Sequence, residues 1–118
     1  MRDAQLLDAR GRVIARLMIC TSLWERIRGL LGRPELGPGE ALLLDPCKAV
    51  HTIGMRYPID IVFLDADNRV VRIKPAMKPL RNTECRQARR VIEFKAGEAA
   101  RLGIDVGCTL DWMDGSPV

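Results

Sequence analysis

Two apolar segments separated by a short polar turn constrain the fold of this chain most strongly. Ile59–Leu64 and Arg69–Ile73 are rich in β-branched residues, and Asp65–Asn68 lies between them. Asp and Asn suit a tight turn because they tolerate left-handed backbone and hydrogen-bond to their own main chain. The pattern predicts a β-hairpin and therefore a chain that builds its core around sheet structure.

Other short segments carry the same kind of strand signal. An opening hairpin is predicted from Gln5–Leu7 and Arg12–Cys20, and single strands at Ala41–Leu44, Arg90–Lys95 and Cys108–Trp112. The stretch Lys74–Arg90 has two prolines and no sustained hydrophobic period, so a long basic loop is expected there.

Two short helices are predicted between the strands. Ser22–Leu31 opens with Ser22 and Glu25 in the spacing of a capping box, and Ala96–Leu102 ends at Gly103. Many short strands with two small helices are typical of a mainly β domain, either a β-sandwich or a partly closed barrel.

Length and composition set the number of domains. The chain has 118 residues, of which 47% are hydrophobic and 29% charged, enough apolar content for one core. A single domain over residues 1–118 is expected, with a frayed tail at 114–118.

The cysteines and the N-terminal residues bear on the compartment. Met1–Gln5 is charged and lacks an apolar stretch, and no segment reaches the length of a membrane span. The four cysteines stand at 20, 47, 85 and 108 without a Cys-x-x-Cys pair, which predicts reduced thiols. These features favour a cytoplasmic protein without a membrane partner.

Four motifs in a fixed order carry a family resemblance. Arg26–Arg33, Val50–Asp65, Val91–Gly97 and Gly103–Gly107 together resemble the domain-of-unknown-function family number 192 over nearly the whole chain. The resemblance implies a compact, predominantly β domain with no established reaction, substrate or cofactor. Many similar proteins have an exported N-terminus, and many have Trp-Met-Lys-Asn-Thr where this chain has His51–Met55, which makes His51 a subgroup feature.

One short segment holds the residue types from which a site could be built. Nucleophile, base, ligand and anion anchor are all represented among Cys47, His51, Thr52, Met55, Arg56 and Asp60.

The conformation of this segment decides whether Cys47 and His51 can meet. A helical turn opened by Pro46 would make them i,i+4 neighbours about 6 Å apart, whereas an extended segment would separate them by about 13 Å. The β-branched Val50, Thr52 and Ile53 favour the extended form.

Each candidate also has a structural explanation. His51 can stand where relatives place an aromatic ring and bond backbone carbonyls, Met55 can fill a gap in the core, and Asp60 can hydrogen-bond the backbone. One cysteine and one histidine fall short of a zinc ligand set, so no metal site and no cofactor are expected.

Basic residues supply a second candidate feature. The net charge is +4, and an anion-binding face is conceivable, although solvated surface charge is the simpler explanation. Aromatic residues make up only 4% of the chain, which argues against nucleic acid as a partner. The basic residues in question are Arg26, Arg28, Arg33, Lys78, Arg81, Arg86, Arg89 and Arg90.

Two functions from different classes remain. The first is a binding module whose concave β surface near His51 and Arg56 holds a small anionic ligand or a protein segment. The second is a thiol-dependent hydrolase or acyltransferase with Cys47 as nucleophile and His51 as base. No third triad member or nucleophile elbow is recognisable, so the binding module is favoured.

Overall fold

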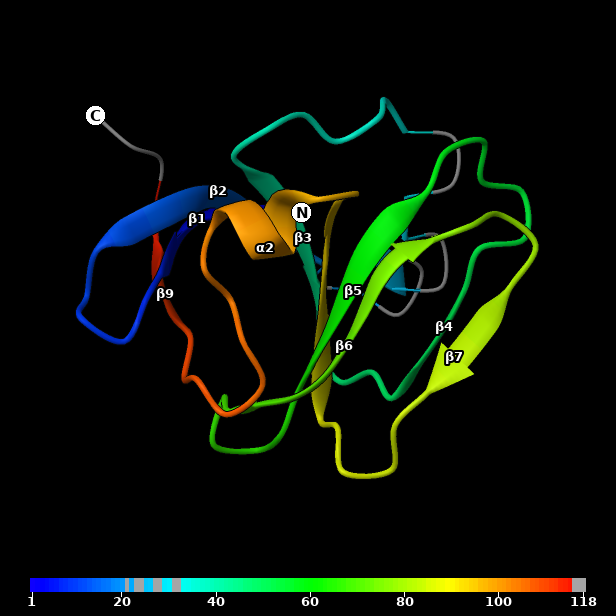
Figure 1. The fold of residues 1–118 in the computed structure, drawn as a ribbon. Coiled ribbons are helices and arrows are strands. Elements are labelled where there is room, and N and C mark those ends of the chain that lie inside the picture. The colour runs from blue at the N-terminus through cyan, green and yellow to red at the C-terminus, as the bar shows by residue number, and fades with distance from the viewer. Residues whose placement is uncertain (21, 23–24, 27–28, 31–32, 116–118) are drawn as a thin grey trace.

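The computed structural model describes residues 1–20, 22, 25–26, 29–30 and 33–115 and is mainly β, as predicted. Within these residues one sheet has the strand order β6-β5-β8-β3-β2-β1-β9, and a smaller sheet pairs β4 with β7 (Figure 1). Neighbouring strands are antiparallel except β2 and β3. The strands are β1 (Arg2–Leu7), β2 (Val13–Cys20), β3 (Glu40–Leu44), β4 (Ala49–His51), β5 (Ile59–Leu64), β6 (Val70–Met77), β7 (Asn82–Glu84), β8 (Arg90–Lys95) and β9 (Asp111–Asp114).

The larger sheet buries apolar side chains on both of its faces. Alternation along β3, β5 and β8 sends Leu43, Val62 and Ile92 to a first cluster, and Leu42 and Ile61 to a second. The short helix α2 (Glu98–Arg101) lies on the first face. The second face is partly covered by β4 and the residues that follow β7.

The sheet curls so that its two ends approach each other. Arg69 and Thr109 form a β-bridge, and the backbone N–H of Val70 donates to the carbonyl of Cys108 at 2.8 Å. The chain leading into β9 therefore meets the start of β6. This makes the sheet a partly closed barrel, one of the two predicted architectures.

The central hairpin forms as its sequence predicts. β5 and β6 pair across the turn, where Asn68 has a φ of 63° and the Asp65 carboxylate accepts hydrogen bonds from the backbone of Asp67 and Arg69. The turn chemistry therefore acts as expected from the residue types.

The two predicted helices have different outcomes. The second lies within its predicted range, as the shorter α2. Much of the first, predicted at Ser22–Leu31, lies outside the described residues. Its capping box is described: Ser22 Oγ accepts from Glu25 N at 3.1 Å, and Glu25 Oε1 accepts from Ser22 N at 3.2 Å.

Two of the sequence-based boundaries are wrong. Lys74–Arg90 is not one long loop, because β6 continues to Met77 and β7 pairs with β4. β7 buries only Thr83, so its strand conformation depends on backbone pairing, and its sequence has no hydrophobic period. The last strand is Asp111–Asp114, shifted from Cys108–Trp112 by its pairing with β1.

Among the described residues, no helix combines the length and the apolar character needed to cross a membrane.

Candidate functional site

A small cavity lies between the second face of the sheet and β4. Its volume is about 60 Å³, and its polar lining consists of Arg26, Cys47, His51 and Glu93. They come from three parts of the chain: Arg26 precedes β3, Cys47 and His51 lie just before and at the end of β4, and Glu93 lies on β8. The remaining lining is apolar apart from backbone, and Leu30 and Met55 form part of it.

Glu93 is the most unusual group in this cavity. Its residue pairs with Leu42 on β3 and Ile61 on β5, so the carboxyl group stands on an apolar face and is only 4% exposed. Among the described residues it has no hydrogen-bond or ion-pair partner. Burial without compensation raises the pKa of Glu93 to about 7.

Glu93 was not predicted from the sequence, although a signal was present. It interrupts an apolar strand and shares its face with Val91, a position that alternation assigns to the core. A buried carboxyl group with a perturbed pKa beside a cavity marks a candidate functional site.

Cys47 lines the cavity as a neutral thiol. Its Sγ–H donates to the carbonyl of Ala49 at 3.1 Å, and burial raises the pKa of the thiol. The segment from Ala49 to His51 is extended, as favoured from its β-branched residues. In the described part of the chain no hydrogen bond joins Cys47 to His51, so the geometry does not activate this thiol.

Cys47 is therefore expected to react slowly with iodoacetamide at neutral pH. The reaction needs the thiolate, which a raised pKa makes rare, so alkylation should be at least about tenfold slower than in the urea-unfolded chain. Peptide mass spectrometry after timed quenching measures both rates. Alkylation of the folded protein at the unfolded rate, or faster, would contradict this geometry.

His51 and Met55 each line both the cavity and a larger hollow. His51 is exposed and also borders a hollow of about 540 Å³ with Arg72 and Glu84. Met55 is half-buried and also borders a hollow of about 560 Å³, in which Arg56 is exposed. We call the latter the arginine hollow; its lining is Leu30, Arg33, Glu35, Gly54, Met55, Arg56 and Tyr57.

Tyr57 has a buried polar atom without a hydrogen-bond partner among the described residues. Its hydroxyl oxygen is shielded from solvent and makes no hydrogen bond within the described ranges. Burial is the main reason that its pKa is raised, and the negative charges of Glu35 and Glu93 add to the effect. Glu93 and the arginine hollow are thus electrostatically coupled.

Thr52 and Asp60 form hydrogen bonds to the backbone and do not line the cavity. The buried Thr52 hydroxyl donates to the carbonyl of Lys78 at 2.7 Å and accepts from the backbone N–H of Arg81 at 2.9 Å. Asp60 is 1% exposed on the first face of the sheet. Its carboxylate accepts hydrogen bonds from the backbone N–H groups of Ala76 (2.8 Å), Gly97 (3.1 Å) and Ala99 (2.9 Å).

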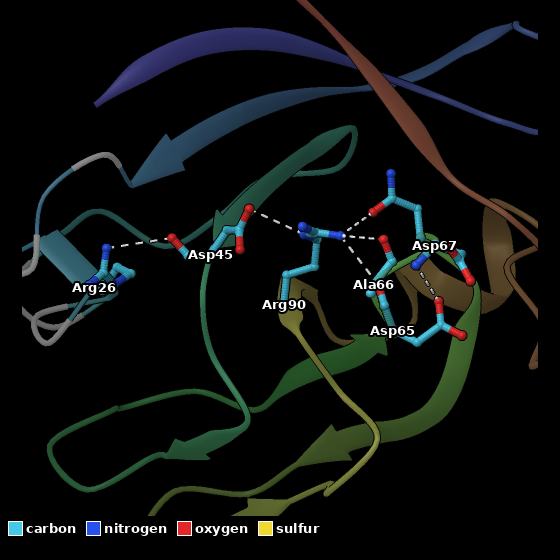
Figure 2. A network of polar contacts seen from close by, with 7 residues as sticks. Arg26, Asp45, Asp65, Ala66, Asp67 and Arg90 are labelled. Carbon is cyan, nitrogen blue, oxygen red and sulfur yellow. Dashed lines mark hydrogen bonds and ion pairs between the residues drawn. The ribbon is translucent and has the colours of Figure 1, made fainter.

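Arg90, one of the basic residues considered for an anion-binding face, has a structural position. Figure 2 shows its guanidinium between Asp45 and the Asp65–Asp67 turn. Its Nε lies 3.2 Å from a carboxylate oxygen of Asp45, and its Nη1 donates to the side-chain oxygen of Asn68 at 2.6 Å. Figure 2 also shows Arg26 at the carbonyl of Asp45, 3.5 Å away.

Within the described ranges, no group of three or more His, Cys, Asp or Glu side chains is arranged to hold a metal ion.

The comparisons with known proteins agree in fold and family. The DUF192 family model, described as "Uncharacterized ACR", matches residues 6–112. A UPF0127 protein of Thermococcus sibiricus is 28% identical in an alignment of 109 residues, and the match covers 87% of this chain and 70% of that protein.

Two crystal structures have the same fold. A protein of unknown function from Novosphingobium aromaticivorans matches with a TM-score of 0.79 and 27% identity, over 93% of this chain and 84% of its own. A protein from Sinorhizobium meliloti, whose name ascribes transcription regulation to it, matches with a TM-score of 0.79 and 23% identity, over 94% and 92% of the two chains. The family match covers most of the sequence, and the chain therefore belongs to the DUF192 family.

Proposed function

We propose that this protein is a small-ligand-binding β module whose ligand carries an anionic group held in the arginine hollow. The observation that carries the proposal is that two arginines, Arg33 and Arg56, line one hollow of about 560 Å³. Ligand sites in proteins usually have volumes of about 300–1,000 Å³. Guanidinium groups bind carboxylates and phosphates through paired hydrogen bonds.

The two arginines keep donors for a ligand. Arg33 uses its Nε to donate to the carbonyl of Gly29 at 2.7 Å. No carboxylate forms an ion pair with Arg33 or Arg56 among the residues that the structure describes. Glu35 is the one acidic residue in the lining, so the hollow has a positive balance.

A binding role fits the neighbouring cavity better than thiol catalysis does. A nucleophilic cysteine needs a lowered pKa or a base in contact, and Cys47 has a raised pKa and donates to a backbone carbonyl. His51 stands at the rim of two openings, where it can contact a bound molecule. We therefore place His51, Met55 and Arg56 around the ligand and assign Cys47 no nucleophilic role.

Titration with butyrate, followed by ¹H–¹⁵N NMR, tests the proposal. Butyrate is expected to shift the amide signals of Gly54–Tyr57, and Arg56→Ala should weaken its binding about tenfold, or about 1.4 kcal/mol. Arg10→Ala is the matched control, because Arg10 is exposed in the β1–β2 turn, away from the hollow. Saturable shifts elsewhere only, or equal affinity in the Arg56→Ala variant, would contradict the proposal.

We also propose that the protein is cytoplasmic. All four cysteines are free thiols, which is the usual state in a reducing compartment.

A further inference from the structure

The cavity at Glu93 and the arginine hollow are adjacent. Leu30 and Met55 line both of them, so these two apolar side chains form the boundary between the spaces. The charge of Glu93 also acts on Tyr57, a residue of the arginine hollow. A molecule in the hollow therefore lies next to the cavity.

The carboxyl group of Glu93 is not matched by the protein around it. Its strand neighbours on the same face are Leu42 and Ile61, and an apolar residue would complete this core. Burying a carboxylate without a donor is costly, so buried polar groups in proteins nearly always have a hydrogen-bond partner. In the described residues that partner is missing, and the group borders an open volume.

The size of the cavity limits what can fill it. A cavity needs about 10–15 Å³ to hold one water molecule, so a cavity of about 60 Å³ admits a group of a few heavy atoms rather than a whole ligand. A primary ammonium with its adjoining methylene fits this limit, and it offers three donors to a carboxyl group that has no donor among the described residues. The remainder of such a ligand must lie outside the cavity.

The other charged residues that line the cavity do not supply a donor to Glu93 within the described ranges. Arg26 lies against the carbonyl of Asp45, and His51 is exposed at the rim. Burial raises the pKa of Glu93, and within the described ranges no ion pair joins its carboxyl group to either residue.

We propose that the ligand is a zwitterion of the amino-acid type, with its ammonium group on Glu93 in the cavity and its carboxylate on Arg33 and Arg56. The methylenes between the two charged ends pack against Leu30 and Met55. This inference rests on the proposed function, to which it adds the second charged end of the ligand. Glu93 is thus a ligand-binding residue in this proposal, since its buried carboxyl group has no hydrogen-bond or ion-pair partner among the described residues.

Paired compounds of equal length test the inference in the full chain. The probes are β-alanine, γ-aminobutyrate and 5-aminopentanoate, each compared with propionate, butyrate or pentanoate, and dissociation constants come from NMR titration. At least one amino acid is expected to bind about tenfold more tightly than its carboxylate partner. In the Glu93→Gln variant that preference should disappear, while the affinity for the carboxylates stays unchanged.

A matched control and a measurement on the unmutated protein complete the experiment. Glu84→Gln changes an exposed carboxylate that lines neither space, so it should keep the full preference. In the wild-type protein, the amino acid that binds most tightly should lower the pKa of Glu93, read from its side-chain ¹³C signal, because an ammonium stabilises the carboxylate.

The outcomes separate the two proposals. Carboxylates that bind at Gly54–Tyr57 without any gain from the amino group, or an unchanged pKa of Glu93, would overturn the zwitterion and leave the anion site standing. Absence of carboxylate binding at the arginine hollow would overturn the proposed function and the inference with it.

Discussion

Replacing Glu93 by Gln is expected to stabilise the protein by about 3 kcal/mol near pH 8 and to change its stability little near pH 4. The pKa of Glu93 rises from 4.5 to about 7 on folding. Below the lower pKa the side chain is protonated in both the folded and the unfolded state, so its burial costs no stability. Between the two values only the unfolded chain ionises, so stability falls as the pH rises and reaches its full loss above the folded pKa.

Urea unfolding at a series of pH values measures this effect. The wild-type free energy of unfolding should fall through this pH interval. That of Glu93→Gln should fall by about 3 kcal/mol less. The pKa values of Cys47 and Tyr57 are raised from already alkaline values, so both stay protonated throughout. His51 and Arg26 also line the cavity, and measuring both proteins in a His51→Gln background removes the histidine from the comparison.

Parallel pH curves for Glu93→Gln and the wild type would show that the carboxyl group obtains enough solvation in the folded state. In that case the strand position of Glu93 would not constrain its protonation. Glu84→Gln serves again as the matched control, because its side chain is exposed and should follow the wild-type curve.

Asp60→Ala is expected to destabilise the protein by about 4 kcal/mol. The Asp60 carboxylate accepts three backbone hydrogen bonds, one from β6 and two from the start of α2. Hydrogen bonds to a charged group contribute about 1.5–3 kcal/mol each, less than additively, and their loss leaves buried N–H groups without a partner. Equilibrium unfolding in urea at neutral pH measures the change.

Two further variants serve as comparisons for Asp60→Ala. Asp105→Ala removes an exposed carboxylate and should change stability by less than about 0.5 kcal/mol. Asp60→Asn keeps one acceptor oxygen and should fall between the wild type and Asp60→Ala. A loss below about 1 kcal/mol for Asp60→Ala would mean that water replaces the carboxylate at these three donors.

The local elements of the fold could be predicted because their signals lie within the elements themselves. The β5–β6 hairpin has β-branched strands and an Asp-Ala-Asp-Asn turn, and β8 has an apolar run. β7 could not be predicted, because its strand conformation comes from pairing His51 with Asn82 and Val50 with Thr83 across a long separation in the chain. Tertiary pairing decided the conformation there.

The candidate site could be predicted only where its residues lie near one another in the sequence. Cys47, His51 and Met55 are near in sequence, and one short segment brings all three to the cavity. Asp60 follows the same segment, but strand alternation turns it to the opposite face, where α2 needs its carboxylate. Glu93 is distant in sequence, and only the sheet order places β8 beneath β4.

That sheet order has a consequence for the protein during its synthesis. β8 lies between β3 and β5, although both leave the ribosome before it. The nascent chain thus holds two separate strand groups whose inner edges have no neighbour until Arg90–Lys95 emerges. Because Glu93 arrives with that strand, the cavity that it lines is among the last features to form, and the proposed ligand site is complete only when nearly the whole chain has been synthesised.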